Sequence, residues 1–370
     1  MGSVEKRVRT MLVRDRKSGE KVPKEVERWY ARYRTPDGRQ RSQVFERERQ
    51  ARDFLTSMEN AKLTGSYIDP SRGRVTVGAL GRQWLDAQAG LAPTTRERYS
   101  GILKRHIEPT WGTVPLTSVT HADVQRWVAA LELAPASVRK THRVLSMVLA
   151  WAVKDERITR NPADRVSLPR VHEAERRYLT HGQVEQLAEA CGPESRLVVL
   201  FLAYTGLRWG EMAALRVHRV DLFRRRVLIA ESVTPVAGVM TWGPTKGHER
   251  REVPVPRFLV DELMRHMAGK DPEALVFEGA RGAVMRSGTF RRGALDRAAR
   301  ELDLDGLHPH ELRHTAASLA IASGADVKVV QQMLGHKSAT MTLDQYGHLF
   351  GDRLDVVADA MDAARTRELA

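Results

Sequence analysis

The chain has 370 residues, of which 42% are hydrophobic, and its formal net charge at pH 7 is +14. This length suffices for two or three domains, while the lack of any apolar run of roughly 18 residues and a polar, arginine-rich N-terminus argue against a membrane span and a signal peptide. The single cysteine, Cys191, excludes an intrachain disulfide and a cysteine-based zinc module. The positive charge favours nucleic acid over membrane as a partner. We therefore expect an intracellular protein.

The first 64 residues predict a small three-stranded sheet followed by one helix. Short strands are expected over residues 8–45, with a Pro-Asp-Gly turn at residues 36–38. The strand before this turn alternates a packing face with an arginine-bearing face, namely Trp29, Ala31 and Tyr33 against Tyr30, Arg32 and Arg34. With a helix near Glu48–Leu63, this suggests a DNA-binding module that uses Arg32 and Arg34; a basic sheet that serves only solubility is the alternative.

Residues 65–74 contain Gly, Ser, Asp, Pro and Arg and are typical of a linker. The pattern then becomes helical over residues 75–165, which predicts an all-α bundle. Thr94 or Thr95 is expected to cap one helix of this bundle, and Thr120 with Asp123 resembles a capping box that opens another.

The longest helix of the bundle is expected near residues 137–155. It places Arg139, Lys140 and Arg143 on a face away from its apolar residues. This face could follow a phosphate backbone, and a solvated charged face is an equally good alternative. The first 170 residues carry the whole excess of positive charge, with 33 Lys and Arg against 19 Asp and Glu, whereas residues 171–370 contain 27 of each. The front half therefore has the charge that a DNA clamp needs.

After a connector at residues 166–177, residues 178–370 are predicted to be mainly helical with a small sheet. Two strand-like segments, RRRVLIA and REVPVP, flank a hairpin loop that holds Lys246. A last amphipathic helix near residues 353–367 is expected to pack on its own domain or on a neighbouring subunit. The predicted fold class is therefore multidomain α+β.

Six side chains in four short motifs form the candidate active site. They are Arg208 in TGLRWGEMAALR, Lys246 in TKGHERREVPV, His310 and Arg313 in HELRH, and His336 and Tyr346 in LGHKSATMTLDQYGHL. Cleavage of a phosphodiester needs cationic donors around the phosphorus, an oxygen nucleophile in line and a proton for the leaving oxygen. The arginines suit the first task, the phenol the second and the lysine the third, and either histidine could assist proton transfer. Taken singly, each residue also has an ordinary structural explanation, so the prediction depends on the joint pattern.

Together these motifs resemble those of the tyrosine recombinases, in particular the phage-type integrases, over essentially the whole chain. By this resemblance, Tyr346 is the nucleophile that forms a 3′-phosphotyrosyl link, Arg208 and Arg313 bind the scissile phosphate, and Lys246 is the general acid. His310 and His336 complete the site, and Glu211 orients Arg208 from one helical turn away. We expect no metal and no cofactor.

The same resemblance assigns domains and partners. It implies an arm-type DNA-binding domain at residues 1–64, a core-binding domain at 75–165 and a catalytic domain at 178–370. The expected partners are double-stranded DNA with arm-type and core-type sites, three further copies of the chain in a homotetramer, a host DNA-bending protein and an excisionase. The expected function is integration, with excision as its reversal, of a mobile or phage genome in the bacterial cytoplasm, in association with the nucleoid.

Four other functions are alternatives. HELRH also spells the HExxH pattern of zinc proteases, with His310 and His314 as ligands and Glu311 as base, although a protease needs neither the basic front half nor the other motifs. A type IB topoisomerase or a chromosome-dimer resolvase uses similar residues but does not need the extra N-terminal sheet. A DNA-binding regulator with a retired site is contradicted by the complete set of catalytic side chains.

Overall fold

The computed structural model describes residues 2–14, 21–35, 38–63, 72–171, 177–245, 250–350 and 354–369. The chain divides into two compact units, Met1–His172 and Glu173–Ala370. Helices and antiparallel sheets are both present, which confirms the predicted α+β class. None of the helices in the described ranges combines the length and the apolar character that a membrane span requires.

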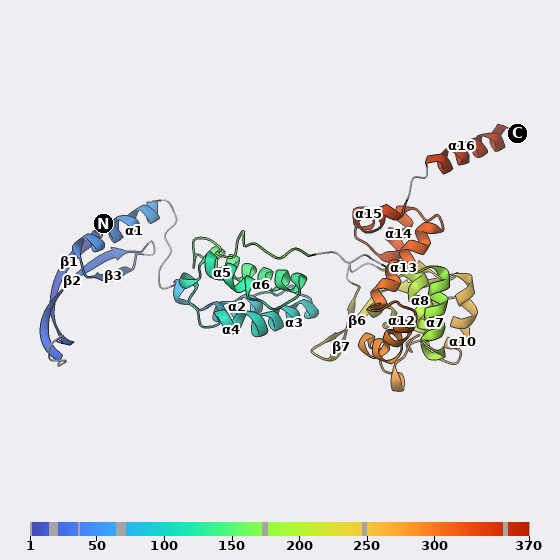
Figure 1. Ribbon diagram of the computed structural model, residues 1–370, viewed down its shortest axis with the longest axis horizontal. Helices are drawn as coiled ribbons and strands as arrows, with labels where there is room; N and C mark the ends of the chain where they lie inside the picture. Colours follow the sequence, from blue (N-terminus) through green and yellow to red (C-terminus); the bar gives the residue numbers. More distant parts are fainter. Residues whose placement is uncertain are drawn as a thin grey trace. The chain divides into compact units, whose positions relative to one another are not determined.

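The first unit begins with an antiparallel sheet of three strands in the order β1-β2-β3, against which one helix packs (Figure 1). The elements are β1 (Ser3–Arg14), β2 (Lys21–Arg34), β3 (Gln40–Phe45) and α1 (Glu48–Leu63). The packed side of β2 is the one that its alternation predicts, because Ala31 and Tyr33 are buried in a cluster with Ala51 and Leu55 of α1. The predicted sheet and helix are therefore confirmed.

Two strands of this sheet, β1 and β2, have 12 and 14 residues, so the prediction of short strands is wrong for them, whereas β3 has six residues and is short as predicted. β1 and β2 pair continuously from Ser3 opposite Arg32 to Arg14 opposite Lys21. Each strand satisfies the backbone hydrogen bonds of the other, so the ladder extends through polar positions that carry no strand signal of their own. Within the predicted turn, Gly38 has a φ of 83°, whereas residues 36–37 lie outside the described residues.

The rest of the described first unit is a helical bundle around buried aromatic and aliphatic side chains. Its elements are η1 (Arg72–Arg74), α2 (Val77–Asp86), α3 (Pro93–Ile102), η2 (Leu103–Ile107), α4 (Glu108–Trp111), η3 (Leu116–Ser118), α5 (His121–Ala129) and α6 (Pro135–Lys154). Trp84, Trp127 and Leu145 lie in one hydrophobic cluster, to which Val166 of the predicted connector also belongs. Burial of this apolar surface stabilises the bundle by roughly 25 cal/mol per Å².

One predicted helix start in the bundle is confirmed and another is wrong. The side chain of Thr120 accepts a hydrogen bond from the backbone N–H of Asp123 at 3.2 Å, and the Asp123 carboxylate accepts one from the backbone N–H of Thr120 at 3.3 Å. Neither Thr94 nor Thr95 caps α3, because Pro93 occupies the first position of that helix. Proline has a helical φ and no N–H to satisfy, so it starts a helix without a side-chain cap.

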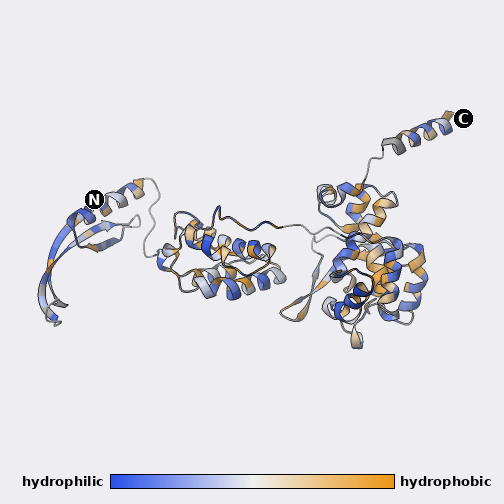
Figure 2. Ribbon diagram, viewed as in Figure 1, coloured by the Kyte–Doolittle hydropathy of each residue, from blue (hydrophilic) through white to orange (hydrophobic). Residues whose placement is uncertain are grey.

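In the second unit, α8 lies at the centre and packs against α7 and α13 (Figure 1). The α-helices are α7 (His181–Ala190), α8 (Pro193–Thr205), α9 (Trp209–Met212), α10 (Val260–Met267), α11 (Ser287–Phe290), α12 (Asp296–Glu301), α13 (Pro309–Ala322), α14 (Val327–Leu334), α15 (Ala339–Tyr346) and α16 (Leu354–Leu369). The 3₁₀-helices are η4 (Val217–Arg219), η5 (Arg257–Leu259), η6 (Ala280–Gly282) and η8 (Gly347–Leu349), and η7 (Arg291–Leu295) is a π-helical turn. Most of α8 is hydrophobic and buried, which places it in the core (Figure 2).

Two small antiparallel sheets interrupt these helices. One has the order β4-β5-β8 and the other is a hairpin of β6 and β7. The strands are β4 (Val220–Asp221), β5 (Arg226–Ile229), β6 (Glu231–Val236), β7 (Val239–Pro244) and β8 (Arg251–Pro254). β5 and β8 correspond to the two predicted segments, but the β6–β7 hairpin was not predicted. Its turn has a positive φ at Ala237 and at Gly238. Alanine rarely adopts a positive φ, so an Ala-Gly pair does not predict a hairpin turn in the way that Asn-Gly or Asp-Gly does.

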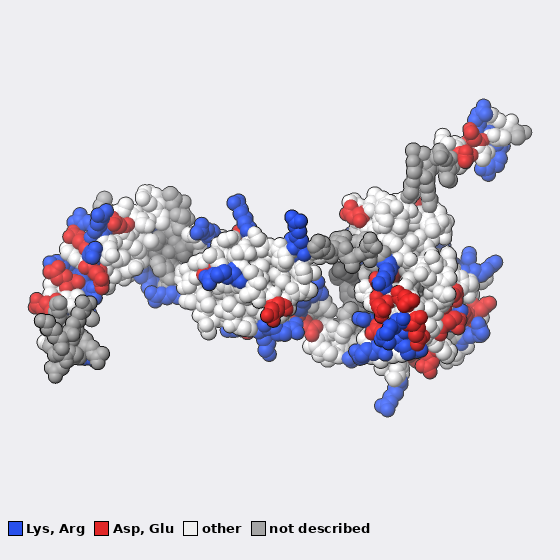
Figure 3. Space-filling model, viewed as in Figure 1, with Lys and Arg blue, Asp and Glu red and all other residues white. Residues whose placement is uncertain are grey.

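Charges of both signs lie side by side on the face of the second unit shown in Figure 3. This mixture agrees with the equal numbers of basic and acidic residues in residues 171–370, where 27 of each occur. Any strongly cationic feature of this unit must therefore come from local arrangement rather than from its composition.

Candidate active site

Glu211 is the centre of the site, because its buried carboxylate holds two arginines. Gly206 follows the last residue of α8, and its left-handed φ of 66° turns the chain so that Arg208 becomes the N-cap of α9. Arg208 donates from Nη1 to one oxygen of Glu211 at 2.9 Å and from its backbone N–H to the other at 3.0 Å. Arg251 of β8 forms a bidentate pair with the same carboxylate at 3.1 and 2.7 Å. Glu211, with a side chain only 1% exposed, thus fixes both guanidinium groups.

Arg313 of α13 joins two segments that carry predicted site residues. Its side chain donates from Nη1 to the carbonyl of Gly206 at 2.7 Å and from Nη2 to the carbonyl of Leu334 at 2.6 Å. These carbonyls belong to the turns that lead to Arg208 and to His336. Arg313 is 2% exposed, and these two bonds account for two of the five N–H donors of a guanidinium.

Tyr346 is the last residue of α15 and is 0% exposed. Its phenol oxygen lies 2.7 Å from Nδ1 of His314, one turn along α13 from His310. The ring of His336 lies parallel to the phenol ring, with centroids 6.4 Å apart and an interplanar angle of 5°. Nδ1 of His336 lies 3.0 Å from the hydroxyl oxygen of Thr342, which orients the imidazole. The structure thus brings the predicted nucleophile and one predicted histidine together.

The electrostatics of the cluster favour an anion. Desolvation would raise the pKa of Glu211, but the hydrogen bond and charge of Arg251 and the charge of Arg208 outweigh it and lower this pKa to about 2. Burial, followed by the charge of Arg208, lowers the pKa of Arg313 to about 9, so this guanidinium is still protonated at neutral pH. Burial, followed by the charges of Arg313 and Arg208, lowers the pKa of His336 to about 4. Beyond the effect of burial, the lowered pKa values of Arg313 and His336 show that the positive charges of the cluster repel one another. A bound phosphate would relieve this repulsion, so the site suits an anion.

Two other predicted site residues have different outcomes. His310 is exposed on the first turn of α13, with its ring centroid 4.8 Å from that of His314, and Lys246 lies outside the described residues. Glu311 accepts a hydrogen bond from the backbone N–H of His308 at 3.1 Å and thereby caps the helix. In the described ranges no group of three His, Cys, Asp or Glu side chains could hold a metal ion.

The sequence motifs did not identify Arg251 as a site residue, and they indicated His314 only as a zinc ligand of the protease alternative. A signal for Arg251 exists, because in β8 it shares a strand face with buried Val253 while Glu252 between them is exposed. For His314 the signal is its spacing of four residues from His310 on one helix. Neither signal predicts the contact that the residue makes, because Arg251 binds Glu211 and His314 binds Tyr346, and both partners lie on other elements.

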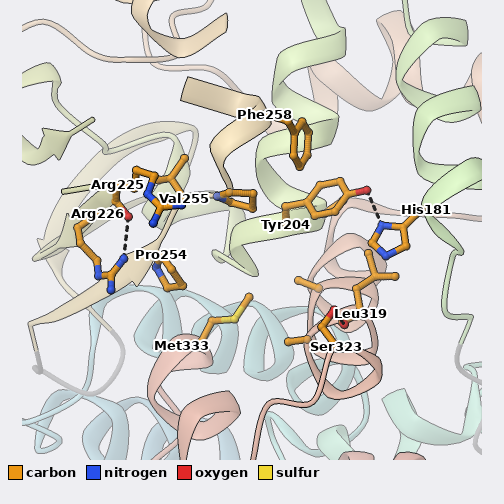
Figure 4. Close-up of a pocket in the computed structure, with 14 residues that line it drawn as sticks. His181, Tyr204, Arg225, Arg226, Pro254, Val255, Phe258, Leu319, Ser323 and Met333 are labelled. Carbon is orange, nitrogen blue, oxygen red and sulfur yellow. Dashed lines mark hydrogen bonds between the residues drawn. The ribbon is translucent and has the colours of Figure 1, made fainter. Parts of the chain in front are cut away.

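The pocket drawn in Figure 4 adjoins this cluster through Met333, whose carbonyl accepts a hydrogen bond from Arg251 at 3.1 Å, but no arginine of the cluster lines it. It has a volume of about 480 Å³ and is lined mainly by apolar side chains, and none of the predicted catalytic residues lines it. Its walls include Tyr204 and Phe258, whose rings meet edge to face, and His181, which is bonded to Tyr204. We therefore assign the candidate site to the arginine cluster and not to this pocket.

The DNA-contact candidates of the first unit lie on its surface. Arg32 is partly exposed and pairs with Glu5 at 2.8 Å, and Arg34 is exposed at the end of β2. On α6, Arg139, Lys140 and Arg143 are all exposed, and Arg139 donates to the carbonyl of Pro169 at 3.0 Å. The three residues of α6 therefore form the basic helix face that their spacing predicts.

Comparisons with known proteins agree with this geometry. The phage integrase family matches residues 177–353, and the phage integrase central domain matches residues 77–168. The tyrosine recombinase XerC of Corynebacterium efficiens is 30% identical over 257 residues, which cover 65% of this chain and 78% of that protein. The chain belongs to the phage integrase family of tyrosine recombinases. The predicted family and the predicted tyrosine-type site-specific recombinase activity are thus confirmed.

Other members of the family are similar in sequence and fold. The integrase of Mycobacterium phage L5 is 28% identical over 296 residues, which cover 78% of this chain and 79% of that protein. The Tn1549 transposon integrase bound to circular-intermediate DNA has a TM-score of 0.66 and 20% identity, covering 78% of this chain and 99% of that one. The lambda integrase tetramer bound to a Holliday junction has a TM-score of 0.55 and 21% identity, covering 84% and 94%. At these identities, both solved structures establish the shared integrase fold.

Proposed function

We propose that this recombinase is an integrase of a phage or other mobile element, and that Tyr346 cuts DNA by forming a 3′-phosphotyrosyl link. The observation that carries the assignment is a buried phenol beside a cluster of three arginines, two of which share one carboxylate. Such a cluster stabilises the charge of a pentavalent phosphate, and a phenol is an oxygen nucleophile that can attack it in line. The relatives that are named integrases support the choice of integration over dimer resolution.

Each side chain has a separate task in this proposal. Arg208 and Arg313 bind the non-bridging oxygens of the scissile phosphate, and Glu211 holds Arg208 in place. Lys246 donates a proton to the leaving 5′ oxygen, and His336 contacts the phosphate as a neutral imidazole. The phosphotyrosyl bond conserves the energy of the phosphodiester, so a 5′ hydroxyl can rejoin the strand without ATP.

Covalent trapping tests the proposal. The full chain is incubated with a library of nicked half-site duplexes, whose cleaved end is lost by diffusion, and the DNA attached to protein is sequenced. Wild-type protein is expected to accumulate a covalent adduct on one family of sequences. Tyr346→Phe is expected to form none while retaining DNA, because it lacks the attacking oxygen.

The matched control is Tyr204→Phe, which removes another phenol of the same unit, one whose hydroxyl is hydrogen-bonded to His181 and not to a residue of the proposed catalytic set. It is expected to trap DNA like wild type. Adduct formation by Tyr346→Phe, or no adduct with any library member, contradicts the proposed function. Light scattering of the wild-type complex on a synthetic Holliday junction counts the protomers, for which we propose four, as in the lambda integrase complex.

The basic face of α6 is proposed to lie along core-site DNA. Replacing Arg139, Lys140 and Arg143 together by alanine is expected to reduce the slope of log Kd against log salt by about 0.9 for each phosphate that is no longer neutralised, roughly two to three in total. The measurement is fluorescence anisotropy on a trapped duplex at several salt concentrations. The control is Arg126→Ala on α5, whose side chain already pairs with Asp123. A triple variant with the slope of wild type would show that this face is only solvated.

The sheet of β1 to β3 is proposed to bind arm-type sites through Arg32 and Arg34, and a host DNA-bending protein and an excisionase are proposed to assist. Such a second DNA-binding module suits an integrase that binds two kinds of sequence. Footprinting of the full chain and of a chain that begins at Val75 tests this, because only the full chain should protect sites outside the core.

A further inference from the structure

The hydroxyl of Tyr346 is engaged by a histidine that the catalytic set proposed above does not include. Nδ1 of His314 lies 2.7 Å from the phenol oxygen, and the ring centroids are 5.8 Å apart at 56°. The phenol is 0% exposed, whereas His314 is half-buried and lies next to exposed His310 on α13. The buried phenol, which must lose a proton to act as a nucleophile, is therefore in direct contact with a basic side chain. That side chain is half-buried and adjoins the exposed His310.

Three other ionisable groups near the phenol, His336, Arg313 and Tyr178, have described contacts of their own. His336 stacks on the phenol ring and directs Nδ1 to Thr342 at 3.0 Å. Arg313 is a cation held by two backbone carbonyls and cannot accept a proton. Tyr178 has its ring centroid 6.5 Å from that of Tyr346, and its hydroxyl lies 3.3 Å from Nε2 of His348. The geometry therefore favours His314 as the acceptor.

We propose that His314 is a further catalytic residue, the general base that takes the phenolic proton of Tyr346 during cleavage and returns it during rejoining. As the Tyr346 oxygen bonds to phosphorus, the phenolic proton passes to Nδ1 of His314. The bond from phosphorus to the 5′ oxygen breaks, and that oxygen takes a proton from the general acid, which is Lys246 in the proposed function. For this step Nδ1 is the unprotonated nitrogen and Nε2 carries the hydrogen. The inference rests on the proposed function and extends it.

His314→Gln and His314→Ala test this role in single-turnover cleavage of a nicked half-site at saturating DNA. Both are expected to slow cleavage about 100-fold or more, the usual contribution of general base catalysis, while DNA retention is unchanged. The matched control is His181→Gln, because Nδ1 of His181 lies 2.8 Å from the hydroxyl of Tyr204 in the same unit (Figure 4). This control pair has the same histidine–phenol contact but belongs to no part of the proposed catalytic set, so the His181→Gln variant is expected to cleave like wild type.

Two substitutions of the reacting groups define the role of His314: fluorination of the phenol separates a base from a residue that only positions it, and a sulfur leaving group separates a base from a general acid. Fluorinated tyrosine at position 346 is more acidic and is expected to restore about ten-fold or more of the rate of His314→Ala, because a base is then less necessary. A 5′-bridging sulfur in the DNA makes a leaving group that needs no proton, so it is expected to rescue Lys246→Ala and not His314→Ala. A residue that only positions the phenol would also not be rescued by the sulfur, but it would show no rescue by fluorination.

The possible failures can be distinguished. If Tyr346→Phe still forms the adduct, the proposed function fails. If Tyr346→Phe is inactive but folded His314→Gln cleaves within about three-fold of wild type, only the role of His314 fails. Rescue of His314→Ala by the bridging sulfur, or no rescue by fluorination, also overturns that role. Thermal melting of both variants verifies that they are folded, and His314→Gln keeps a side chain of similar size if the alanine variant is unstable.

Discussion

Arg313→Ala is expected to cleave a nicked half-site about 1000-fold more slowly than the wild type. Arg313 lies in the cationic cluster, and loss of one preorganised donor to a transition-state charge costs about 3–4 kcal/mol. Its hydrogen bonds to two backbone carbonyls, at 2.7 and 2.6 Å, also fix the turns before Arg208 and His336. The substitution therefore also makes the positions of Arg208 and His336 less well defined. Arg313→Lys keeps the charge but lacks the planar fork, and we expect it to remain strongly impaired.

The measurement is the single-turnover rate of adduct formation, together with DNA retention and a thermal melt. The control is Arg196→Lys, because Arg196 is a partly exposed arginine of the same unit that binds three carboxylates and lies outside the cluster. It is expected to change the rate less than three-fold, since exposed pairs contribute little. A folded Arg313→Ala protein that cleaves within about ten-fold of wild type would contradict the role of Arg313 in phosphate binding.

Glu211→Gln is expected to lower the free energy of unfolding by about 3–5 kcal/mol. The carboxylate is 1% exposed and Arg251 is 11% exposed, so removal of the negative charge leaves a buried guanidinium without its counter-ion. Chemical denaturation at neutral pH measures the effect. The double variant Glu211→Leu, Arg251→Met is expected to recover much of the loss, because it removes both charges and keeps apolar volume. The control Glu262→Gln breaks a more exposed pair with Arg196 and is expected to cost at most about 1 kcal/mol.

The effect of Glu211→Gln also depends on pH in a defined direction. Because the pKa of Glu211 is lowered to about 2 in the folded protein, the stabilisation is complete above the ordinary carboxyl pKa of roughly 4.3. It is lost as the pH falls towards 2, where the folded protein must also bind the proton. The stability difference between wild type and variant is therefore expected to shrink over this range, and a difference that stays constant would rule out the buried ion pair as its source.

Some elements of the fold follow from local residues. The capping box of Thr120 and Asp123 sets a helix start, and the alternation around Ala31 and Tyr33 identifies the packed face of β2. Such features depend on neighbours in the chain, so the sequence displays them. The β6–β7 hairpin was missed because its turn residue Ala237 adopts a positive φ that only the paired strands enforce.

The candidate site likewise has features that local sequence predicts and features that depend on tertiary contacts. The chemistry can be predicted from the motifs alone, because two arginines, a lysine, two histidines and a tyrosine in four ordered motifs identify the family and the phosphodiester reaction. Which of these groups are in contact depends on how the chain folds. The fold places Arg251 against Glu211 and His314 against Tyr346, although 40 and 32 residues separate the partners. These contacts arise from the packing of α14 beside β8, α13 and α15, and helix and strand periodicity carries no record of which elements meet.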